Sequence, residues 1–460
     1  MQLKHRSVLL ISPNRTVPKV ENKRIAPPLG LLYIASVLEK NGINVSILDT
    51  ALEGYANEKE INDRILYGLD DDKIIDKINQ INPDIIGITF SFSSEIGNIY
   101  HLCRLIKNFN KNIKVVVGGI HPSFSTQFTL ENKDIDYVIR GEGEYAFLNL
   151  ISNKLDSKGI AFRKNNSMKI PPFSDFVDVN KLPFPAWHLV DIEKYIKINK
   201  FHSPYAKHSR VMNIITSRGC FGRCIYCSSS NFFGHAVRGR ITENILQEIN
   251  LLVDKYNIKE IQFEDDNVAF DRNRFVDLLQ GLKKIAIEWC LPNGMRVDTV
   301  NEELLELMAE SGCYQVTFGI ESGSEEILRF IKKPLKLDRI KPLIDRAKEL
   351  GILTHTFFMI GFPNETKEQM EQTVKFAEYL NPDSASFAIV TPLIGTELFD
   401  MCKIKESFEY FENSFYDSSD RESEESKLSS SPFATARELE EKVNELNARF
   451  KNLDRFKKNQ

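Results

Sequence analysis

The amino-terminal third of the chain alternates short apolar runs with longer stretches in which apolar residues recur every three or four positions. The short runs are rich in Val and Ile and are closed by Gly, Ser or Asp, which is typical of buried β-strands. Strands alternating with helices predict an α/β fold, a doubly wound, Rossmann-like parallel sheet over residues 1–155, with a ligand site beyond the carboxyl ends of its strands. We predict strands at 7–12, 43–49, 84–91, 113–119 and 136–141, and helices at 29–41 and 97–110.

A second α/β series follows a proline-rich, aperiodic stretch that is typical of a linker, which we place at 156–204. Within 205–400, six apolar runs are separated by stretches of helical period. Six strand–helix units exceed what one flavodoxin-like sheet usually needs and fall short of a closed eight-stranded barrel. We therefore predict a partial, TIM-like (β/α)6 barrel with its chemistry at the carboxyl ends of the strands. The predicted strands are 211–217, 258–264, 287–295, 314–320, 352–360 and 384–390.

Residues 401–460 have a different character. A Ser- and Glu-rich stretch, 417–432, predicts a charged, flexible spacer. After it, apolar residues recur at three and four positions and predict an amphipathic helix. We expect this helix to dock on its own domain, because a stable coiled coil usually needs three or four heptads. The apolar positions are Ala436, Leu439, Val443, Leu446, Phe450 and Leu453.

Composition narrows the class of protein. The 460 residues are 42% hydrophobic and 27% charged, with a net charge of −4, so the chain can bury full cores and has no basic stripe for a nucleic acid. No run reaches the roughly 18 apolar residues of a membrane span, and the amino-terminal apolar run is too short for a secretory signal. Seven cysteines, three of them clustered, do not resemble a disulfide framework. We expect a cytoplasmic protein.

The clustered cysteines are Cys220, Cys224 and Cys227, in a loop directly after the first strand of the second series. A structural zinc site normally needs four ligands, and no second pair lies nearby. Three thiolates suit a four-iron cluster that leaves one iron open for an exogenous ligand. The remaining cysteines lie in helix or strand patterns and are most simply small buried side chains. They are Cys103, Cys290, Cys313 and Cys402.

The cysteine spacing, with Tyr226 before the last cysteine and a six-fold strand–helix series around it, resembles the radical S-adenosylmethionine enzymes. The resemblance covers about 205–400 and implies a [4Fe–4S] cluster on the three cysteines, with S-adenosylmethionine on the open iron. Further matches are "FEDDNVAFD" after strand two and "GIESGSEEIL" after strand four. At strand two the family's GGE-type motif is replaced by Glu-Asp-Asp. The S-adenosylmethionine contacts that the resemblance implies are Tyr226, Glu264, Asp265, Arg296, Glu321 and Ser322.

Local alternatives stay open for several of these side chains. A carboxylate at the end of a strand, such as Glu321, can simply cap the next helix. Arg296 could pair with the carboxylate of the bound amino acid or with Asp298. Asp265 and Asp266 could cap the helix predicted at 272–285.

The amino-terminal domain resembles the cobalamin-binding domain fused to many of these enzymes. The stretches that match are "PPLGLLYIASVLEKNG", "PDIIGITFSFSS", "VVVGGIHPSF" and "DYVIRGEGEYAF". The DxHxxG loop of the older cobalamin mutases is missing, so the resemblance implies cobalamin with neither base nor His below the cobalt. His121 is an alternative ligand, although a polar role in its loop is the better interpretation. The implied cobalamin-binding residues are Ser91, Ser93, Gly118, Gly119, His121, Gly141 and Glu142.

Together these resemblances imply a cobalamin-dependent radical S-adenosylmethionine enzyme, similar to class B methyltransferases. Family chemistry implies a 5′-deoxyadenosyl radical that removes a hydrogen atom from an unactivated carbon of a small molecule or natural product. It also implies that methylcobalamin donates the methyl group to that carbon. An electron donor such as flavodoxin or ferredoxin is implied. The alternatives are a non-methylating radical enzyme that catalyses ring formation or oxidative rearrangement, and a non-catalytic cobalamin or redox sensor. An RNA methylthiotransferase fits poorly, because the amino-terminal domain has only one cysteine and the tail is not basic.

Overall fold

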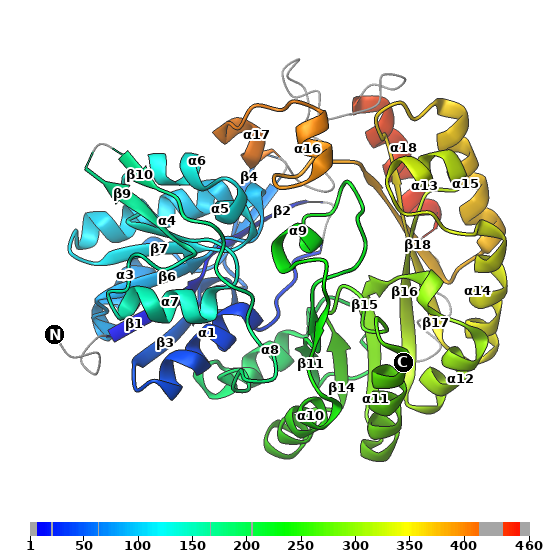
Figure 1. The fold of residues 1–460 in the computed structure, drawn as a ribbon, viewed down its shortest axis with the longest axis horizontal. Helices are drawn as coiled ribbons and strands as arrows, with labels where there is room; N and C mark the ends of the chain where they lie inside the picture. Colours follow the sequence, from blue (N-terminus) through cyan, green and yellow to red (C-terminus); the bar gives the residue numbers. More distant parts are fainter. Residues whose placement is uncertain are drawn as a thin grey trace. The chain divides into compact units, whose positions relative to one another are not determined.

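The computed structural model describes residues 7–19, 22–62, 64–165, 167–203, 206–413 and 436–450. The chain divides into two compact units (Figure 1). Unit 1 comprises Met1–Ile198 and Ile404–Ser414, and unit 2 comprises Asn199–Lys403 and Phe415–Gln460. The segment 404–414, which follows the second domain along the chain, therefore belongs to the first. Among the described residues, no helix combines the length and the apolar character needed to cross a lipid bilayer.

Unit 1 is built on a seven-stranded sheet in the order β10-β9-β8-β7-β6-β1-β3. Its five central and edge strands from β8 to β3 are parallel, and β9 and β10 extend the sheet antiparallel from within the stretch expected as a linker. The strand order reverses between β1 and β6, so the crevice beyond their carboxyl ends is the expected ligand site. The bounds are β1 (Ser7–Ser12), β3 (Asn44–Asp49), β6 (Ile85–Thr89), β7 (Lys114–Gly118), β8 (Tyr137–Ile139), β9 (Ile160–Lys164) and β10 (Ser167–Lys169).

Helices cover this sheet because each presents one apolar stripe to it. In α1 (Leu29–Lys40), Leu31, Ala35 and Leu38 are buried in one core with Phe147 and Leu150 of α7. A small antiparallel sheet in the order β2-β5-β4 was not predicted. Its strands are β2 (Arg15–Pro18), β4 (Glu58–Ile61) and β5 (Arg64–Tyr67), and the other helices are α2 (Thr50–Glu53), α3 (Asp71–Ile81), η2 (Ser93–Glu95), α4 (Ile96–Phe109), α5 (Ile120–Phe124), α6 (Thr126–Glu131), α7 (Gly143–Ile151), η3 (Trp187–Leu189) and α8 (Ile192–Ile198).

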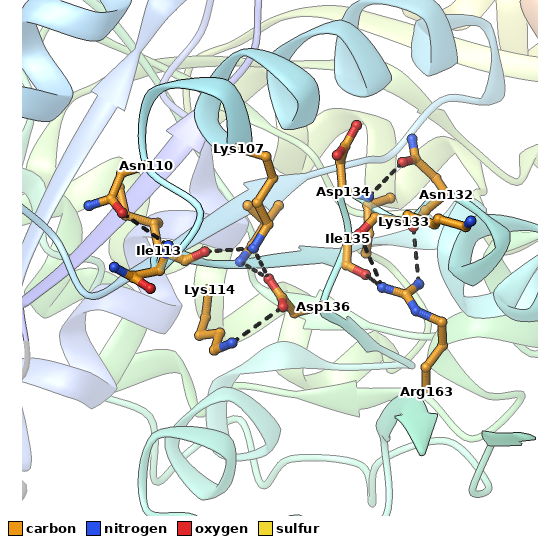
Figure 2. A network of polar contacts seen from close by, with 12 residues as sticks. Lys107, Asn110, Ile113, Lys114, Asn132, Lys133, Asp134, Ile135, Asp136 and Arg163 are labelled. Carbon is orange, nitrogen blue, oxygen red and sulfur yellow. Dashed lines mark hydrogen bonds and ion pairs between the residues drawn. The ribbon is translucent and has the colours of Figure 1, made fainter. Parts of the chain in front are cut away.

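A polar network fastens the amino ends of β7 and β8, the edge opposite the expected ligand site (Figure 2). The Asp136 carboxylate accepts hydrogen bonds from the Lys107 ammonium and from the backbone N–H of Val115. The Arg163 guanidinium, from β9, donates to the backbone carbonyls of Asn132 and Lys133 and of two neighbouring residues. We call these contacts the amino-end network; they belong to the scaffold of unit 1.

Unit 2 has a six-stranded parallel sheet in the order β11-β14-β15-β16-β17-β18, which follows the chain. Helices α10 to α15 lie along its outer side (Figure 1). The strands are β11 (Val211–Ile214), β14 (Glu260–Phe263), β15 (Glu288–Met295), β16 (Cys313–Glu321), β17 (Leu353–Ile360) and β18 (Ser384–Ile389). The helices are α10 (Thr242–Tyr256), α11 (Arg272–Ile285), η4 (Val297–Thr299), α12 (Glu302–Glu310), α13 (Glu325–Phe330), η5 (Leu337–Arg339), α14 (Ile340–Glu349) and α15 (Lys367–Leu380).

The edge strand β18 is covered by α18 (Ala436–Arg449), as expected for an amphipathic helix that docks on its own domain (Figure 1). Leu439, Val443 and Leu446 are buried. The Asn447 side chain accepts a hydrogen bond from the backbone N–H of Phe387 and donates one to its carbonyl. An uncovered strand edge is a template for unwanted pairing, and this helix removes that exposure.

Candidate cofactor sites

The cysteine loop of unit 2 is closed at its base by a two-stranded ribbon. β12 (Ser217–Arg218) pairs antiparallel with β13 (Arg238–Gly239), and the loop between them carries the three cysteines and α9 (Ser229–Phe233). The backbone N–H of Cys220 donates to the carbonyl of Gly234, 3.2 Å away. Gly219 has φ +96°, and a β-carbon there would stand 2.8 Å from that carbonyl oxygen. The loop is therefore a pre-formed structure rather than a free connection.

Within this loop the sulfurs of Cys220 and Cys224 flank Gly222. A β-carbon on Gly222 would contact the Arg296 guanidinium at 3.3 Å and the two sulfurs at 3.4 and 3.7 Å, so glycine leaves the space beside these three groups open. Backbone N–H groups of Gly222 and Ser229 donate to the sulfurs of Cys220 and Cys227, which favours their thiolates. Burial acts more strongly in the other direction, and it raises the pKa of Cys227 to about 12.

The thiols fit an iron–sulfur cluster better than a single ion. Among the described residues, no group of three or more His, Cys, Asp or Glu side chains is arranged to hold one metal ion. In a four-iron cluster each thiolate binds a different iron, so the sulfurs need not converge on one point. Two sulfurs around a cleared space, with N–H donors to the thiolates, match this need.

Arg296 supports the cysteine loop from the side. Its guanidinium forms two hydrogen bonds with the Asp298 carboxylate, at 3.0 and 2.7 Å, and lies over the ring of Phe221 with 5.2 Å to the centroid. Of the two partners left open by the sequence, the structure has Asp298. In this arrangement Arg296 stiffens the loop that carries Phe221 and Gly222.

The Glu-Ser-Gly-Ser sequence at the end of β16 comprises residues 321–324, and these residues have different partners. The Glu321 carboxylate pairs with the Lys333 ammonium at 2.6 Å. Ser322 is fully buried, and its hydroxyl shares a hydrogen bond with that of Thr373 on α15. A β-carbon on Gly323 would meet the backbone of α15 at 2.7 Å, and the Ser324 side chain caps α13 by accepting from the backbone N–H of Ile327. Of these residues, Glu321 is the one that interacts with the cysteine loop, through Tyr226.

Glu321 takes an unusual backbone conformation to reach this position. Its φ is +72°, the left-handed region that costs a residue other than glycine about 1 to 2 kcal/mol. The pairing of β16 with β17 also shifts register between Gly319 and Glu321. Such cost persists where surrounding structure enforces it, and it is common at functional sites.

Tyr226 lies between the cysteines and Glu321. The pKa of its phenol is raised, first by burial and then by the Glu321 carboxylate and by the thiols of Cys224 and Cys227. The adjacent Ile225 donates its N–H to the carbonyl of Ile331 and accepts from the N–H of Leu398, in α16 (Glu397–Met401). The loop is thus tied to the turn that carries Lys333.

The three acids after β14 have three different environments. Glu264 is partly exposed, and its carboxylate contacts the His202 ring nitrogen at 3.0 Å. Asp265 is buried and accepts from the backbone and hydroxyl of Thr216 and from the hydroxyl of Ser217, so it fixes the entrance to the cysteine loop. Asp266 accepts from Ser229, and burial raises its pKa to about 6. The cap of α11 is Asp271 instead.

In unit 1, the predicted cobalamin residues gather at the carboxyl ends of β6 and β7. Gly119 has φ +125°, and a β-carbon there would lie 2.5 Å from the carbonyl oxygen of Phe90, so this turn requires glycine. Gly118 precedes it at the end of β7, and Ser91 is half-buried beyond β6. The Ser93 hydroxyl is 2.8 Å from Nδ1 of His121. These residues lie at the carboxyl edge of the sheet, next to the switch point between β1 and β6.

His121 is sealed within unit 1. Its ring stacks on Phe90 at 4.2 Å between centroids and meets the edge of Phe411 at 4.6 Å. Burial lowers its pKa to about 3, and its Nε2 has no hydrogen-bond partner among the described residues. Phe411 comes from α17 (Phe408–Glu412), which packs on η2 and α4. In this arrangement the His121 ring is enclosed by Phe90 and Phe411 within unit 1.

Gly141 and Glu142, after β8, hold the chain segment that crosses the sheet edge. Gly141 has φ +82° and its N–H donates to the hydroxyl of Ser123. The Glu142 carboxylate accepts from the backbone N–H of Val177, and its carbonyl accepts from the Ser174 hydroxyl. These contacts give both residues a role inside the fold.

The comparisons with known proteins assign both units. A B12 binding domain model matches residues 17–151, and a Radical SAM superfamily model matches 214–377. Cytidylyl-2-hydroxyethylphosphonate methyltransferase of Streptomyces wedmorensis is 36% identical over 451 residues, covering 90% of this chain and 84% of the relative. The chain belongs to the cobalamin-dependent radical S-adenosylmethionine methyltransferase family. This membership confirms the predicted α/β fold, the enzyme class and the cofactors, namely a [4Fe–4S] cluster, S-adenosylmethionine and cobalamin.

Two further similarities show the breadth of this radical S-adenosylmethionine family. The methyltransferase TsrM from Kitasatospora setae superposes with a TM-score of 0.68 at 20% identity, over 86% of this chain and 76% of that one, and so shares the fold. Anaerobic magnesium-protoporphyrin IX monomethyl ester cyclase of Rubrivivax gelatinosus is 29% identical over 409 residues, covering 85% of this chain and 69% of the relative.

For a radical S-adenosylmethionine enzyme, the structure adds residues that the sequence did not indicate. Lys333 lies 12 positions beyond its partner Glu321, on the far side of a helix. Phe221 and His202 also contact predicted site residues. A lysine in a turn and a histidine in an aperiodic segment give no periodic signal, so pattern alone could not place them. Phe411, which contacts His121, could have been noticed in the sequence, because an aromatic residue in a polar segment often packs against another part of the fold.

Proposed function

We propose that this protein transfers a methyl group from S-adenosylmethionine to an unactivated carbon atom of a small organic substrate by a radical reaction. The observation that carries the proposal is the combination, on one chain, of a cysteine loop fitted to an iron–sulfur cluster and a switch-point edge of the cobalamin-binding kind. The alignment with a named methyltransferase covers 90% of this chain, and therefore both units.

In this proposal Cys220, Cys224 and Cys227 hold the cluster, and the ribbon at the base of the loop fixes their spacing. When bound, the cluster and cobalamin supply the reducing electron and the methyl carrier. Tyr226 and Glu321 hold S-adenosylmethionine beside the loop. Glu264 is a candidate for its amino group, because its side chain is partly exposed and its carboxylate contacts only the His202 ring among the ion pairs of the described residues.

Unit 1 would hold cobalamin at the carboxyl edge of its sheet near the switch point, where Ser91 and Ser93 follow β6 and the Gly118–Gly119 turn ends β7. A glycine turn lets the backbone approach a bulky ligand closely. Because Phe411 covers the ring of His121, this residue would shape the cobalamin-binding edge from within the fold.

The partners follow from this chemistry. The substrate is a small molecule, and the relative from Streptomyces wedmorensis suggests a nucleotide-linked phosphonate as the first compound to test. An external one-electron donor such as flavodoxin or ferredoxin would reduce the cluster. Because thiols and an oxygen-sensitive cluster need a reducing compartment, we place the enzyme in the cytoplasm.

The test is an anaerobic assay with S-adenosylmethionine that carries a trideuterated methyl group and cytidylyl-2-hydroxyethylphosphonate as the probe. Mass spectrometry should find a product heavier by that methyl group, together with 5′-deoxyadenosine and S-adenosylhomocysteine. A product with two fewer hydrogens and no added methyl group would favour ring formation or oxidation instead, as the similarity to a cyclase allows. Intact S-adenosylmethionine with fully loaded protein would contradict the proposal.

A further inference from the structure

The Glu321–Lys333 pair is a buried ion pair next to the cysteine loop. Nζ of Lys333 lies 2.6 Å from Oε1 of Glu321, and their side chains are only 8% and 9% exposed. The lysine immediately before it offers a contrast: Lys332 pairs with Glu397 at the same distance, but with side chains about half exposed. One turn of chain therefore carries a surface pair and a buried pair side by side.

The chain makes room for the buried pair. A β-carbon on Gly319 would stand 2.6 Å from Oε1 of Glu321 and 2.9 Å from Nζ of Lys333, so any larger residue would collide with both. The register shift in β16 and the positive φ of Glu321 bring the carboxylate to the same point. The register shift, the positive φ of Glu321 and the lack of a side chain at Gly319 together allow the Glu321–Lys333 contact.

The position of the pair is fixed relative to the cysteines. The carbonyl of Ile331, two residues before Lys333, accepts a hydrogen bond from the N–H of Ile225, which lies between Cys224 and Tyr226. The turn that carries Lys333 and the loop that carries the cysteines are therefore joined through the backbone.

The pair also keeps unused hydrogen-bonding capacity. A carboxylate has two acceptor oxygens and a lysine ammonium has three donors. The described residues give Glu321 one partner, through Oε1, and leave Oε2 without one. A buried ion pair contributes little net stability, since apolar residues of similar volume can often replace it. Stability alone therefore does not account for this pair, and the remaining carboxylate oxygen is available for a ligand.

We propose that Lys333 is a positioning residue of the S-adenosylmethionine site, whose ammonium group holds the Glu321 carboxylate so that its second oxygen receives a donor group of S-adenosylmethionine. This inference rests on the proposed function. It adds a residue that neither the cysteine motif nor the strand-end motif contains, and it assigns Glu321 its orientation through Lys333.

The experiment uses full-length protein loaded with its cluster and measures the dissociation constant of S-adenosylmethionine by anaerobic equilibrium dialysis. Lys333→Met and Glu321→Met should each weaken binding by about tenfold to hundredfold, the range for a hydrogen bond to a charged group. The double variant should bind no more weakly than either single variant, because the lysine acts through the carboxylate. The matched control, Lys332→Met, should bind like the wild type, and iron content should stay unchanged in all.

Binding within twofold of the wild type in Lys333→Met, or losses that multiply in the double variant, would overturn the inference. If Lys333→Met does not fold, because it leaves a buried carboxylate unpaired, the exchange Glu321→Lys with Lys333→Glu keeps a buried pair but moves the carboxylate. This exchange should fold and load iron yet lose S-adenosylmethionine binding, and wild-type binding by it would also overturn the inference. Absence of binding in the wild type itself would instead contradict the proposed function.

Discussion

The motif residues at the carboxyl ends of the two parallel sheets differ in how far their polar groups are used within the fold. In unit 1 the motif residues are largely used inside the fold: His121 is covered by Phe411, and Glu142 accepts from the backbone of Val177. In unit 2, Glu321 and the cysteine loop keep acceptor atoms and cleared space. A strand-end motif can therefore shape a surface for a large ligand or supply chemical groups to a small one.

The comparison predicts its largest effect at the cysteines of unit 2. Replacing Cys220, Cys224 and Cys227 together by Ala should abolish cluster loading, because no other thiols lie in the loop. Iron analysis and EPR after anaerobic reconstitution measure this. Cobalamin content should not change, since these cysteines belong to unit 2.

The control for that variant is Cys402→Ala, another partly exposed cysteine of the same unit. It should load iron like the wild type. Equal iron loss in both variants would mean that the cluster does not depend on the cysteine loop.

In unit 1 we expect backbone shape to matter most. Gly119→Ala forces a β-carbon to within 2.5 Å of the Phe90 carbonyl at a positive φ. It should lower cobalamin content and destabilise the unit by about 1 to 3 kcal/mol. Gly30→Ala, where a β-carbon meets nothing within 4 Å, should change neither quantity. Thermal unfolding and the cobalamin absorbance of the purified proteins provide the readouts, and full cobalamin content in Gly119→Ala would refute this view of the edge.

A smaller effect is expected on the pH dependence of stability, from the buried side chain of His121. The folded-state pKa of His121 is lowered to about 3 from its usual value near 6.5, because burial disfavours the imidazolium. The unfolded chain therefore takes up a proton as pH falls below 6.5 while the folded chain does not. Stability should be complete above pH 6.5 and fall by about 2 kcal/mol by pH 5.

Replacing His121 by Leu should remove this part of the pH dependence, which is measured as the difference between the unfolding profiles of the two proteins from pH 5 to 8. An unchanged profile would mean that the ring titrates normally and that Phe411 does not seal it.

The smallest effect should come from the amino-end network of unit 1. Asp136→Asn weakens the pairing with Lys107 at the edge away from the ligand and should cost about 1 kcal/mol. Cobalamin content should match that of the wild type in an absorbance assay. A loss of cobalamin would show that the two edges of the sheet are coupled.

The two units also differ in how much of their structure could be predicted from the sequence. The main strands of both sheets were predictable, because they contain short apolar runs closed by Gly, such as Val115–Val117 in β7 and Phe357–Ile360 in β17. The small β2-β5-β4 sheet was not, since the exposed strand β4 reads EKEI and has no apolar alternation. The three cysteines pointed to the family of unit 2 through their spacing, together with Tyr226 and the strand–helix series around them. The pairing of Lys333 with Glu321 and the docking of α17 on unit 1 depend on tertiary contacts without local periodicity.

The central claim is that one chain uses a cluster on the cysteine loop and cobalamin in unit 1 to activate S-adenosylmethionine. The most direct test incubates the fully loaded protein with S-adenosylmethionine and a reductant under anaerobic conditions, and measures 5′-deoxyadenosine and S-adenosylhomocysteine. We predict both products from the wild type, and loss of 5′-deoxyadenosine in the triple cysteine variant. Formation of 5′-deoxyadenosine by that variant, or of neither product by the wild type, would contradict the account.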